Sequence, residues 1–384
     1  MPKSANVLFL SHSGNWGGAQ KSLLALINYL GLKKAFIPYF IFGSKGDFSN
    51  HIEKRGYKTF EFILLRCNRY KFSFRRVLWF IFNFFHGIYL ICRIIKKDNI
   101  EIVHTNTIFN FQGAIAAKLM NVKHIWHIRE DISLPYFDFL ISNELLIKFI
   151  SYFSDWIICI SEVEARLFSY NSKKSIIYNT WQLDNSQKAQ PGKLFSGEKE
   201  ETVIFAQFGS IFPNKNQIWF VKSFIELCRE YYNCEAYLIG KKIKQYEDYH
   251  SKITNTIEVS GFAKRIKILP FTKDIDSWYK KIDVQVNPML RGVVGRITIE
   301  SMSYGIPCIG TCDNINQGIV DHGLNGFLVD FNNKIQLKNA MARLMDYNLR
   351  MKIGENALYK SKNILNIDRY GSSISDIYNK LLEL

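Results

Sequence analysis

The sequence predicts an α/β protein made of two domains, each a doubly wound parallel sheet, that face each other across a central cleft. Its 384 residues are enough for two domains of ordinary size. Short apolar runs alternate with segments of helical length, which is typical of strands joined by crossover helices. This alternation stops at a polar stretch over 182–201 and then starts again. With 47% hydrophobic and 22% charged residues, the chain is neither disordered nor of low complexity.

The first domain is expected to cover residues 1–181. Short apolar runs bounded by polar or turn residues predict its strands, at 6–11, 37–42, 59–62, 101–105, 124–127, 156–160 and 175–178. Longer segments with helical apolar spacing predict its helices, at 19–30, 75–96, 110–120 and 143–153. Strands connected in this way form a parallel sheet that helices cover on both faces.

The second domain is expected over 202–365, after an interdomain linker at 182–201 that contains few apolar residues. Strands are predicted at 202–209, 236–240, 256–259, 284–287, 308–310 and 327–329, and helices at 217–231 and 334–345. A last helix, within 366–384, is expected to pack back on the first domain. Ligands of open α/β sheets bind beyond the carboxyl ends of the strands, so the cleft between the domains is the expected site.

The net charge of +16 favours an anionic partner, which can be nucleic acid, anionic lipid or a phosphorylated small molecule. Much of this charge falls in 54–97, where eleven Lys or Arg and twelve aromatic residues accompany a single acid, Glu61. Such a mixture suits an anionic membrane surface, and the alternative is a core helix with a solvated basic flank. The apolar run at 77–92 is shorter than the roughly twenty residues of a spanning helix.

Other signals narrow the functional class. The seven cysteines are scattered, which favours reduced thiols over a metal site or a disulfide framework. The first apolar run is too short for a signal peptide, so a cytoplasmic protein is expected. No helix-turn-helix, zinc or RNA-binding signature is present, and nucleic acid is therefore not an expected partner.

Two glycine-containing loops each connect a predicted strand to a predicted helix. The first includes Gly17 and Gly18, and the second runs from Gly209 to Lys215. Glycines before a helix let the backbone amides approach a phosphate closely. Gln20 stands where a P-loop needs glycine before its lysine, so the first loop fits either a tight turn or a phosphate cradle. Lys215 can reach a diphosphate in the cleft, or it can be an exposed surface lysine.

The most informative segment runs from Asn287 to Pro307. A predicted strand ends at Asn287, glycines turn the chain, and Glu300 follows in an otherwise apolar short helix. A buried carboxylate needs hydrogen-bond partners. Two hydroxyls of a diol such as a ribose are natural partners, because each hydrogen bond to a charged group contributes about 1.5–3 kcal/mol.

These residues resemble the retaining, nucleotide-sugar-dependent glycosyltransferases of the bacterial group 1 class (family 4), which have the GT-B fold of two Rossmann-like domains. The run from Gly295 to Met302 is the specific part of the resemblance. Further matching segments are Gly17–Gln20, 102–104, 126–130, 160–162, 178–179, Gly209 with Lys215, and 320–329. The resemblance implies transfer of a sugar from a nucleotide-diphosphate donor to a lipid-linked or cell-surface glycan, in polysaccharide or lipopolysaccharide biosynthesis at the inner face of the cell membrane.

The resemblance also implies roles for single residues. Gly17 and Gly18 hold the donor phosphates, and Lys215 neutralises the diphosphate leaving group. Gly295 and Arg296 present amides near the β-phosphate.

The remaining implied roles concern the nucleoside and the sugar. Glu300 binds the ribose, and His127 faces the sugar at the reaction centre, although an isolated histidine on an apolar strand is otherwise usually a core residue. The base is expected near Leu269 and Phe271, through backbone groups.

The chain departs from the family pattern at donor-contacting positions. Gly292 stands where the family has a second glutamate, and Ser210 stands where an arginine is common. A later glutamate is replaced by Gly318. Gly292 and Ser210 are still counted among the donor-binding positions. Three explanations stay open: a water, Arg291 or another side chain substitutes, the donor sugar is unusual, or activity is reduced or absent.

No cofactor and no metal are expected. Asp274 and Asp276 resemble the acidic pair of the other glycosyltransferase fold, but their place before a helix favours a capping role for Asp276. Lys215 and the helix N-termini then stabilise the departing diphosphate. Two alternatives stay open, a degraded GT-B protein that binds a nucleotide or partner without transfer, and a nucleotide-sugar epimerase of similar fold.

Overall fold

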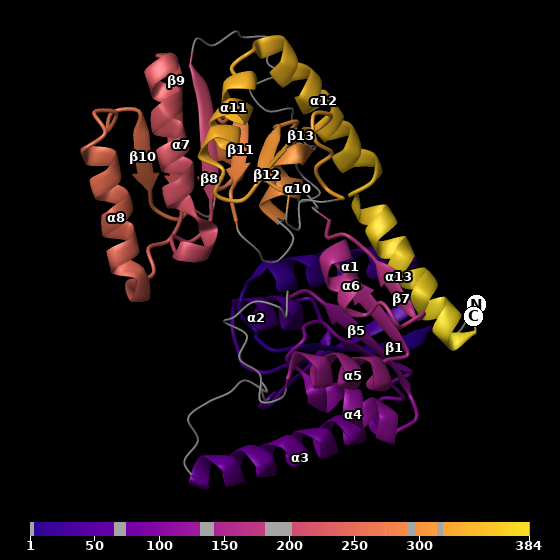
Figure 1. Ribbon diagram of the computed structural model, residues 1–384. Coiled ribbons are helices and arrows are strands. Elements are labelled where there is room, and N and C mark those ends of the chain that lie inside the picture. Colours follow the sequence, from indigo (N-terminus) through magenta and orange to yellow (C-terminus); the bar gives the residue numbers. More distant parts are fainter. Residues whose placement is uncertain are drawn as a thin grey trace. The chain divides into compact units, whose positions relative to one another are not determined.

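The computed structural model describes residues 4–64, 74–130, 142–180, 202–272, 274–289, 296–312 and 318–383. The chain divides into two compact units (Figure 1). Unit 1 contains Met1–Thr180 and Ile367–Leu384, and unit 2 contains Trp181–Asn366. Each unit is an α/β structure around its own parallel sheet, as the sequence predicts.

Unit 1 is built on a seven-stranded sheet in the order β3-β2-β1-β4-β5-β6-β7, with every pair parallel. Its strands are β1 (Ala5–Ser11), β2 (Phe36–Phe42), β3 (Lys58–Glu61), β4 (Ile102–Thr105), β5 (Lys123–Ile128), β6 (Trp156–Cys159) and β7 (Lys174–Ile176). The inner strand β1 is apolar from Val7 to Leu10 because helices cover both faces of the sheet. The strand order reverses between β1 and β4, and such a reversal opens a crevice at the carboxyl ends of the two strands.

The helices of unit 1 connect these strands or follow the last of them. They are α1 (Gly18–Lys33), α2 (Asp47–Lys54), α3 (Phe74–Lys97), α4 (Phe111–Leu119), α5 (Asn143–Phe153), α6 (Glu162–Leu167) and α13 (Ile367–Leu382). Side chains of Ser142 and Ser161 cap the N-termini of α5 and α6 by accepting backbone N–H bonds.

Helix α13 belongs to unit 1 although unit 2 separates it from the other helices in sequence. Its buried residues Tyr370, Ile374 and Tyr378 join the core that β1, β2 and α1 form. Gly371 allows close packing there, because a Cβ atom on it would lie 2.2 Å from Cγ of Tyr29 on α1.

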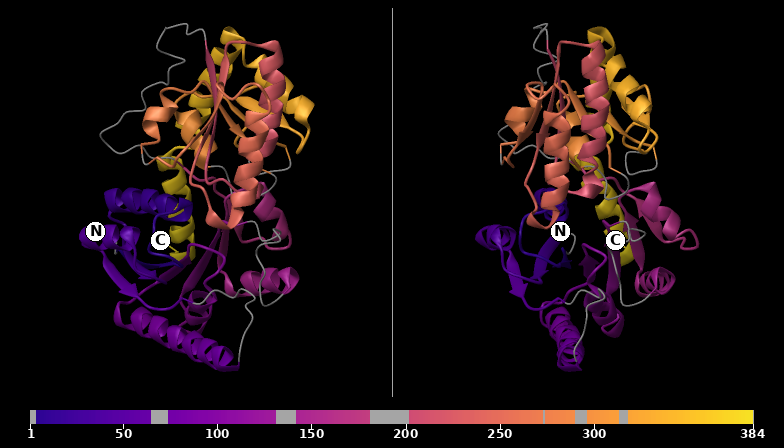
Figure 2. Two further views of the ribbon diagram at one scale, coloured as in Figure 1. Left: turned by 90° about the vertical axis from the view of Figure 1, so that its left-hand side faces the viewer. Right: turned by 60° about the vertical axis from the view of Figure 1, so that its left-hand side comes forward.

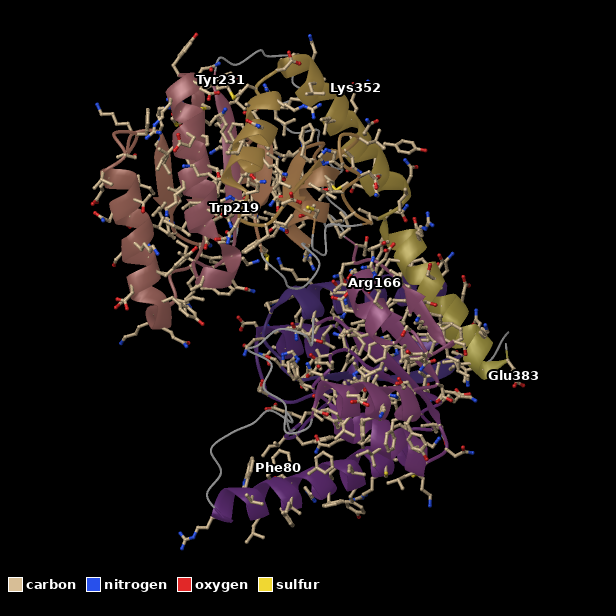
Figure 3. The ribbon with its side chains drawn as sticks, viewed as in Figure 1. Phe80, Arg166, Trp219, Tyr231, Lys352 and Glu383 are labelled. Carbon is tan, nitrogen blue, oxygen red and sulfur yellow. The ribbon has the colours of Figure 1, made fainter. Side chains whose placement is uncertain are left out.

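Helix α3 lies at the outer side of unit 1 in every view (Figures 1 and 2). Its core-facing residues, including Ile88, Ile91 and Ile95, pack with β1 and α4. The opposite face is apolar and exposed, and it carries Leu78, Trp79, Phe82, Phe85 and Tyr89. Val77 and Ile81, near the N-terminal end of the helix, are also exposed, and Phe80 marks that end in Figure 3. By length and composition, Val77–Lys97 qualifies as a membrane span, with a mean hydropathy of 1.7. The packing of the isoleucines makes α3 instead a covering helix of the sheet with a second apolar face that is exposed among the described residues.

Unit 2 is built on a six-stranded parallel sheet in the order β10-β9-β8-β11-β12-β13. Its strands are β8 (Val203–Phe208), β9 (Cys234–Ile239), β10 (Ile266–Leu269), β11 (Val284–Asn287), β12 (Cys308–Thr311) and β13 (Gly326–Val329). The order reverses between β8 and β11, which repeats the arrangement of unit 1.

The helical elements of unit 2 pack on both faces of this sheet. They are η2 (Pro213–Lys215), α7 (Gln217–Glu230), η3 (Lys244–Tyr246), α8 (Glu247–Glu258), α9 (Asp276–Tyr279), α10 (Arg296–Ser303), α11 (Lys334–Arg343) and α12 (Tyr347–Asn363). Trp219 and Tyr231 mark the two ends of α7 in Figure 3. Its buried face joins the main core of unit 2.

Three predictions in unit 2 were wrong in detail. The segment 256–259 ends a helix, because Ile253 and Ile257 form its four-residue apolar spacing. The strand that follows this helix is β10, which the sequence reasoning missed, and α12 is a further helix after α11. At α9 the capping side chain belongs to Asp274, whose Oδ1 accepts the N–H of Ser277 at 3.2 Å, and not to Asp276.

The close contact at Gly371 predicts that Gly371→Ala destabilises the protein. Overpacking against Tyr29 costs about 1–3 kcal/mol and exceeds the gain of up to about 1 kcal/mol in helix propensity. Chemical denaturation measures the change. Gly31→Ala in α1 is the matched control, because its Cβ meets only the Tyr57 hydroxyl at 3.5 Å. Equal stability of the two variants would contradict the packing of α13 on α1.

Candidate active site

The strand reversal of unit 2 holds Lys215. The ammonium nitrogen lies 3.1 Å from Sδ of Met289, which follows β11, so the contact spans the crevice between β8 and β11. A thioether is a weak acceptor, and among the described residues no carboxylate pairs with this lysine. Burial lowers the pKa of Lys215 to about 8. A desolvated cation with so weak a partner is well suited to an anionic ligand.

The loop around Lys215 is tightly built. Gln207 donates to the Lys215 carbonyl at 2.6 Å, which fixes the backbone. Gly209 has a φ of +130°, and a Cβ there would lie 3.2 Å from Cε of Lys215. A Cβ on Gly240, at the end of β9, would lie 1.8 Å from the carbonyl oxygen of Gly209. Both glycines are therefore needed for the lysine to occupy this place, and Ser210 follows in the same loop.

Glu300 is 3% exposed and lies in α10. Its two oxygens already accept protein hydrogen bonds, one from the Tyr279 hydroxyl at 2.9 Å and one from Nε of Arg296 at 2.5 Å. The expected partners were ribose hydroxyls alone, and the structure adds a phenol and a guanidinium. A ligand hydroxyl would use the remaining lone pairs of the carboxylate or replace Arg296.

A cavity of about 530 Å³ opens beyond the ends of β9 and β10. Gly240, Lys241, Lys242, Leu269 and Phe271 are among its lining residues. The Leu269 carbonyl accepts the N–H of Gly240 at 3.1 Å, and Phe271 is 64% exposed. The pair predicted for a base thus borders one cavity of unit 2.

In unit 1 the predicted phosphate loop follows β1. Gly17 is the N-cap of α1 in an extended conformation, and Gly18 is the first helical residue. A Cβ on Gly17 would lie 2.8 Å from Oε1 of Gln20, whereas the space around Gly18 is open. No acidic residue occupies the first turn of α1, so its amides are open to an anion.

His127 is fully buried near the end of β5. Its Nδ1 lies 3.2 Å from Nε2 of His104 and 3.4 Å from Nη2 of Arg129. Burial and the charge of Arg129 hold the pKa of His127 well below its usual range, so the ring is neutral. Nε2 of His127 has no hydrogen-bond partner in the part of the chain that the structure describes.

Arg129 organises the polar groups next to His127. Its Nε donates to Asn106 at 2.9 Å, Nη1 to Asn179 at 2.6 Å, and Nη2 to the Tyr370 hydroxyl at 2.9 Å. The guanidinium therefore connects the ends of β4 and β5 with the segment after β7 and with α13.

Glu130 is a second buried acid of this region. Its Oε2 accepts the N–H of Ile108 at 2.9 Å and of Arg129 at 3.3 Å. Burial outweighs these contacts and raises its pKa to about 7.

The sequence reasoning gave no role to several of these residues. A pattern of His, Arg and Glu at the end of the buried strand β5 was a usable signal for Arg129 and Glu130. No sequence signal marked Tyr279 or Tyr370, because each is an aromatic residue in an ordinary amphipathic segment.

The comparisons with known proteins identify the class of this chain. Residues 188–359 match the family model for glycosyl transferases group 1. The chain is 26% identical over 309 residues to UDP-Gal:α-D-GlcNAc-diphosphoundecaprenol α-1,3-galactosyltransferase of Escherichia coli, covering 74% of this chain and 77% of that one. It is 25% identical over 176 residues to the lipopolysaccharide core biosynthesis mannosyltransferase LpcC of Rhizobium leguminosarum bv. viciae, covering 46% and 50%.

The fold agrees. A crystal structure of HepE from Anabaena in complex with UDP matches 98% of this chain and 100% of that one, with a TM-score of 0.78 and 18% identity. These matches make the chain a glycosyltransferase that is similar to the group 1 family over residues 188–359. Its two Rossmann-like sheets confirm the predicted GT-B architecture.

The sites predicted for this glycosyltransferase fall into three sets. The structure brings Lys215, Gly209 and Ser210 together in one loop, and Glu300 with Arg296 in one helix. Gly292 and Gly295 lie outside the described residues. Among the residues described, no group of three or more His, Cys, Asp or Glu side chains is placed to hold a metal ion.

The lowered pKa of Lys215 predicts an alkaline limit for donor binding by this glycosyltransferase. Above a pH of about 8 the free enzyme carries a neutral lysine, so kcat/KM for the donor falls about tenfold for each further pH unit. A pH–rate profile measures this fall. Lys215→Arg is the control, because a guanidinium stays charged. The assignment to Lys215 is wrong if this variant keeps the same alkaline limit.

Proposed function

We propose that this glycosyltransferase moves a sugar from a nucleotide-diphosphate donor to a glycan acceptor, with retention of configuration and without a metal, as family 4 enzymes do. The observation that carries the proposal is Lys215, a half-buried ammonium at the strand reversal of unit 2 whose hydrogen bond goes to a thioether. A diphosphate that leaves with the nucleotide needs such a positive charge.

The other donor contacts are proposed around this lysine. The exposed ring of Phe271 offers a stacking surface for a planar base. Glu300 binds ribose hydroxyls. Arg296 keeps its hydrogen bond to Glu300 or donates a hydrogen bond to a phosphate. Gly17 and Gly18 supply backbone amides at the N-terminus of α1, and His127 contacts the sugar. Ser210, Gly292 and Gly295 complete the proposed set.

We propose a lipid-linked or cell-surface glycan as the acceptor, in polysaccharide or lipopolysaccharide biosynthesis. The support is the name of the E. coli relative, whose acceptor is a diphosphoundecaprenol-linked sugar, and of the R. leguminosarum relative, which acts in lipopolysaccharide core synthesis. An acceptor of this kind is presented at the membrane surface.

The exposed face of α3 fits a peripheral membrane role on the inner face of the cell membrane. Leu78, Phe82, Phe85 and Tyr89 follow one another at intervals of three or four residues and are all exposed. Exposed Arg75, Arg93, Lys96 and Lys97 belong to the same helix. Aromatic and aliphatic groups enter the headgroup boundary, and the cations meet anionic lipid.

Donor binding is tested by thermal shift with nucleoside diphosphates and nucleotide sugars. A ligand at 100 times its dissociation constant stabilises by about 2.7 kcal/mol, or about 5–10 °C for a unit of this size. We expect a shift with one class of nucleotide, and transfer or hydrolysis of its sugar.

Glu300→Gln is expected to lower donor affinity or turnover about 10²-fold, because it weakens a charged hydrogen bond. Tyr279→Phe is the control, since it removes one partner of Glu300 and leaves its charge. Unchanged binding and turnover in Glu300→Gln would refute the ribose assignment.

Membrane binding is tested by co-sedimentation with anionic and neutral vesicles. Replacing Phe82 and Phe85 by Ser is expected to weaken binding roughly 10- to 100-fold, because less apolar surface enters the bilayer boundary. The control replaces exposed apolar residues of unit 2, Leu324 and Tyr359, by Ser. Equal binding of neutral and anionic vesicles would refute the electrostatic contribution to membrane binding. Equal binding of the two double variants would refute the role of α3 in it.

Two alternatives are separated by the same assays. A degraded GT-B protein, suggested by Gly292 and Ser210, binds a nucleotide but neither transfers nor hydrolyses its sugar. A nucleotide-sugar epimerase returns an altered nucleotide sugar in the absence of any acceptor.

A further inference from the structure

Four buried side chains of unit 1 form a chain of hydrogen bonds that ends at His127. The hydroxyl of Tyr378 on α13 lies 2.7 Å from Nδ1 of His104 on β4. Nε2 of His104 lies 3.2 Å from Nδ1 of His127 on β5. Arg129 approaches the same Nδ1 at 3.4 Å. All four residues are at most 3% exposed, so water does not replace these contacts.

Arg129 determines which nitrogen of His127 carries the proton. A guanidinium only donates hydrogen bonds. Nδ1 of His127 must therefore offer a lone pair, since an N–H at that position would face the N–H of Arg129. A neutral imidazole holds one proton, and it then lies on Nε2.

His104 adopts the matching state. Its Nε2 donates to the lone pair on Nδ1 of His127, so its own Nδ1 has no proton and accepts the Tyr378 hydroxyl. Burial, followed by the charge of Arg129, holds the pKa of His104 well below its usual range, and the ring is neutral as this pattern requires.

We infer that Tyr378 and His104 are positioning residues that, together with Arg129, fix His127 as a donor through Nε2–H. This atom is buried, and no partner for it exists among the described residues. The inference rests on the proposed contact between His127 and the sugar, and it specifies the nature of that contact. His127 donates a hydrogen bond to a substrate oxygen and does not remove a proton from the acceptor.

The tautomer is read directly by NMR of the full protein with ¹⁵N-labelled histidine rings, without substrate. We expect His127 and His104 both to carry their proton on Nε2, and His127→Gln and His104→Gln assign the signals. A proton on Nδ1 of His127 overturns the inference.

Tyr378→Phe removes the phenol oxygen and keeps the ring in the core. We expect a mixture of tautomers at His104 and a fall of about three- to tenfold in kcat, with little change in KM for the donor, because the lost preference amounts to one ordinary hydrogen bond. Unchanged tautomers at His104 overturn the role of Tyr378.

Tyr29→Phe is the matched control. It removes a phenol oxygen from the same helix interface, where Tyr29 contacts α13, but it has no contact with either histidine. We expect native tautomers and native kcat. If Tyr29→Phe lowers kcat as much as Tyr378→Phe does, the effect belongs to the packing of α13 and the inference is wrong.

The ring signals do not depend on catalysis. Absence of sugar transfer by the wild type with native Nε2–H signals would refute the proposed function and leave the hydrogen-bond chain in place. Sugar transfer by a protein whose His127 carries its proton on Nδ1 would support the proposed function and refute the inference about the hydrogen-bond chain.

Discussion

The reversal of strand order beside the first strand of each sheet is the constraint on which the candidate site residues of each unit depend. In a parallel sheet every strand ends at the same edge, and two neighbouring strands whose connections leave in opposite directions keep that edge open. In unit 2 the open edge receives Lys215, which reaches across it to Met289. In unit 1 it receives the glycine loop after β1, where Asn106, at the end of β4, donates to the Ala19 carbonyl at 3.3 Å.

The two open edges differ in how they treat charge. Unit 2 keeps a half-buried cation beside a weak acceptor. Desolvation lowers the pKa of Lys215, and its charge is left to be balanced by a ligand. Unit 1 surrounds its buried cation, Arg129, with neutral oxygen acceptors. The first arrangement favours binding of an anion, and the second favours a rigid polar framework around His127.

The sequence was sufficient for the elements whose burial is local. β1 is a continuous apolar run, and Lys215 and Glu300 stand out because a charge occurs where apolar residues or glycines are expected. The sequence could not predict features that depend on a contact with a residue far away along the chain. Among the described strands the edge strand β10 pairs with β9 alone. Only one of its four residues is fully buried, so its pattern was weaker than that of the neighbouring helix. His104 and Tyr378 are 274 residues apart, and no local pattern connects a phenol in an amphipathic helix with a histidine in a strand.

The position of α13 also bears on the synthesis of the protein. Arg129 and its acceptor Tyr370 are separated by 241 residues, and all of unit 2 lies between them. A ribosome has therefore made the whole of unit 2 before the phenols that complete unit 1 are translated. During that interval the buried histidines and Arg129 lack part of their hydrogen bonds, and the sheet of unit 1 lacks a covering helix. Unit 1 is begun first and finished last, so a nascent chain holds an incomplete polar framework until both units exist.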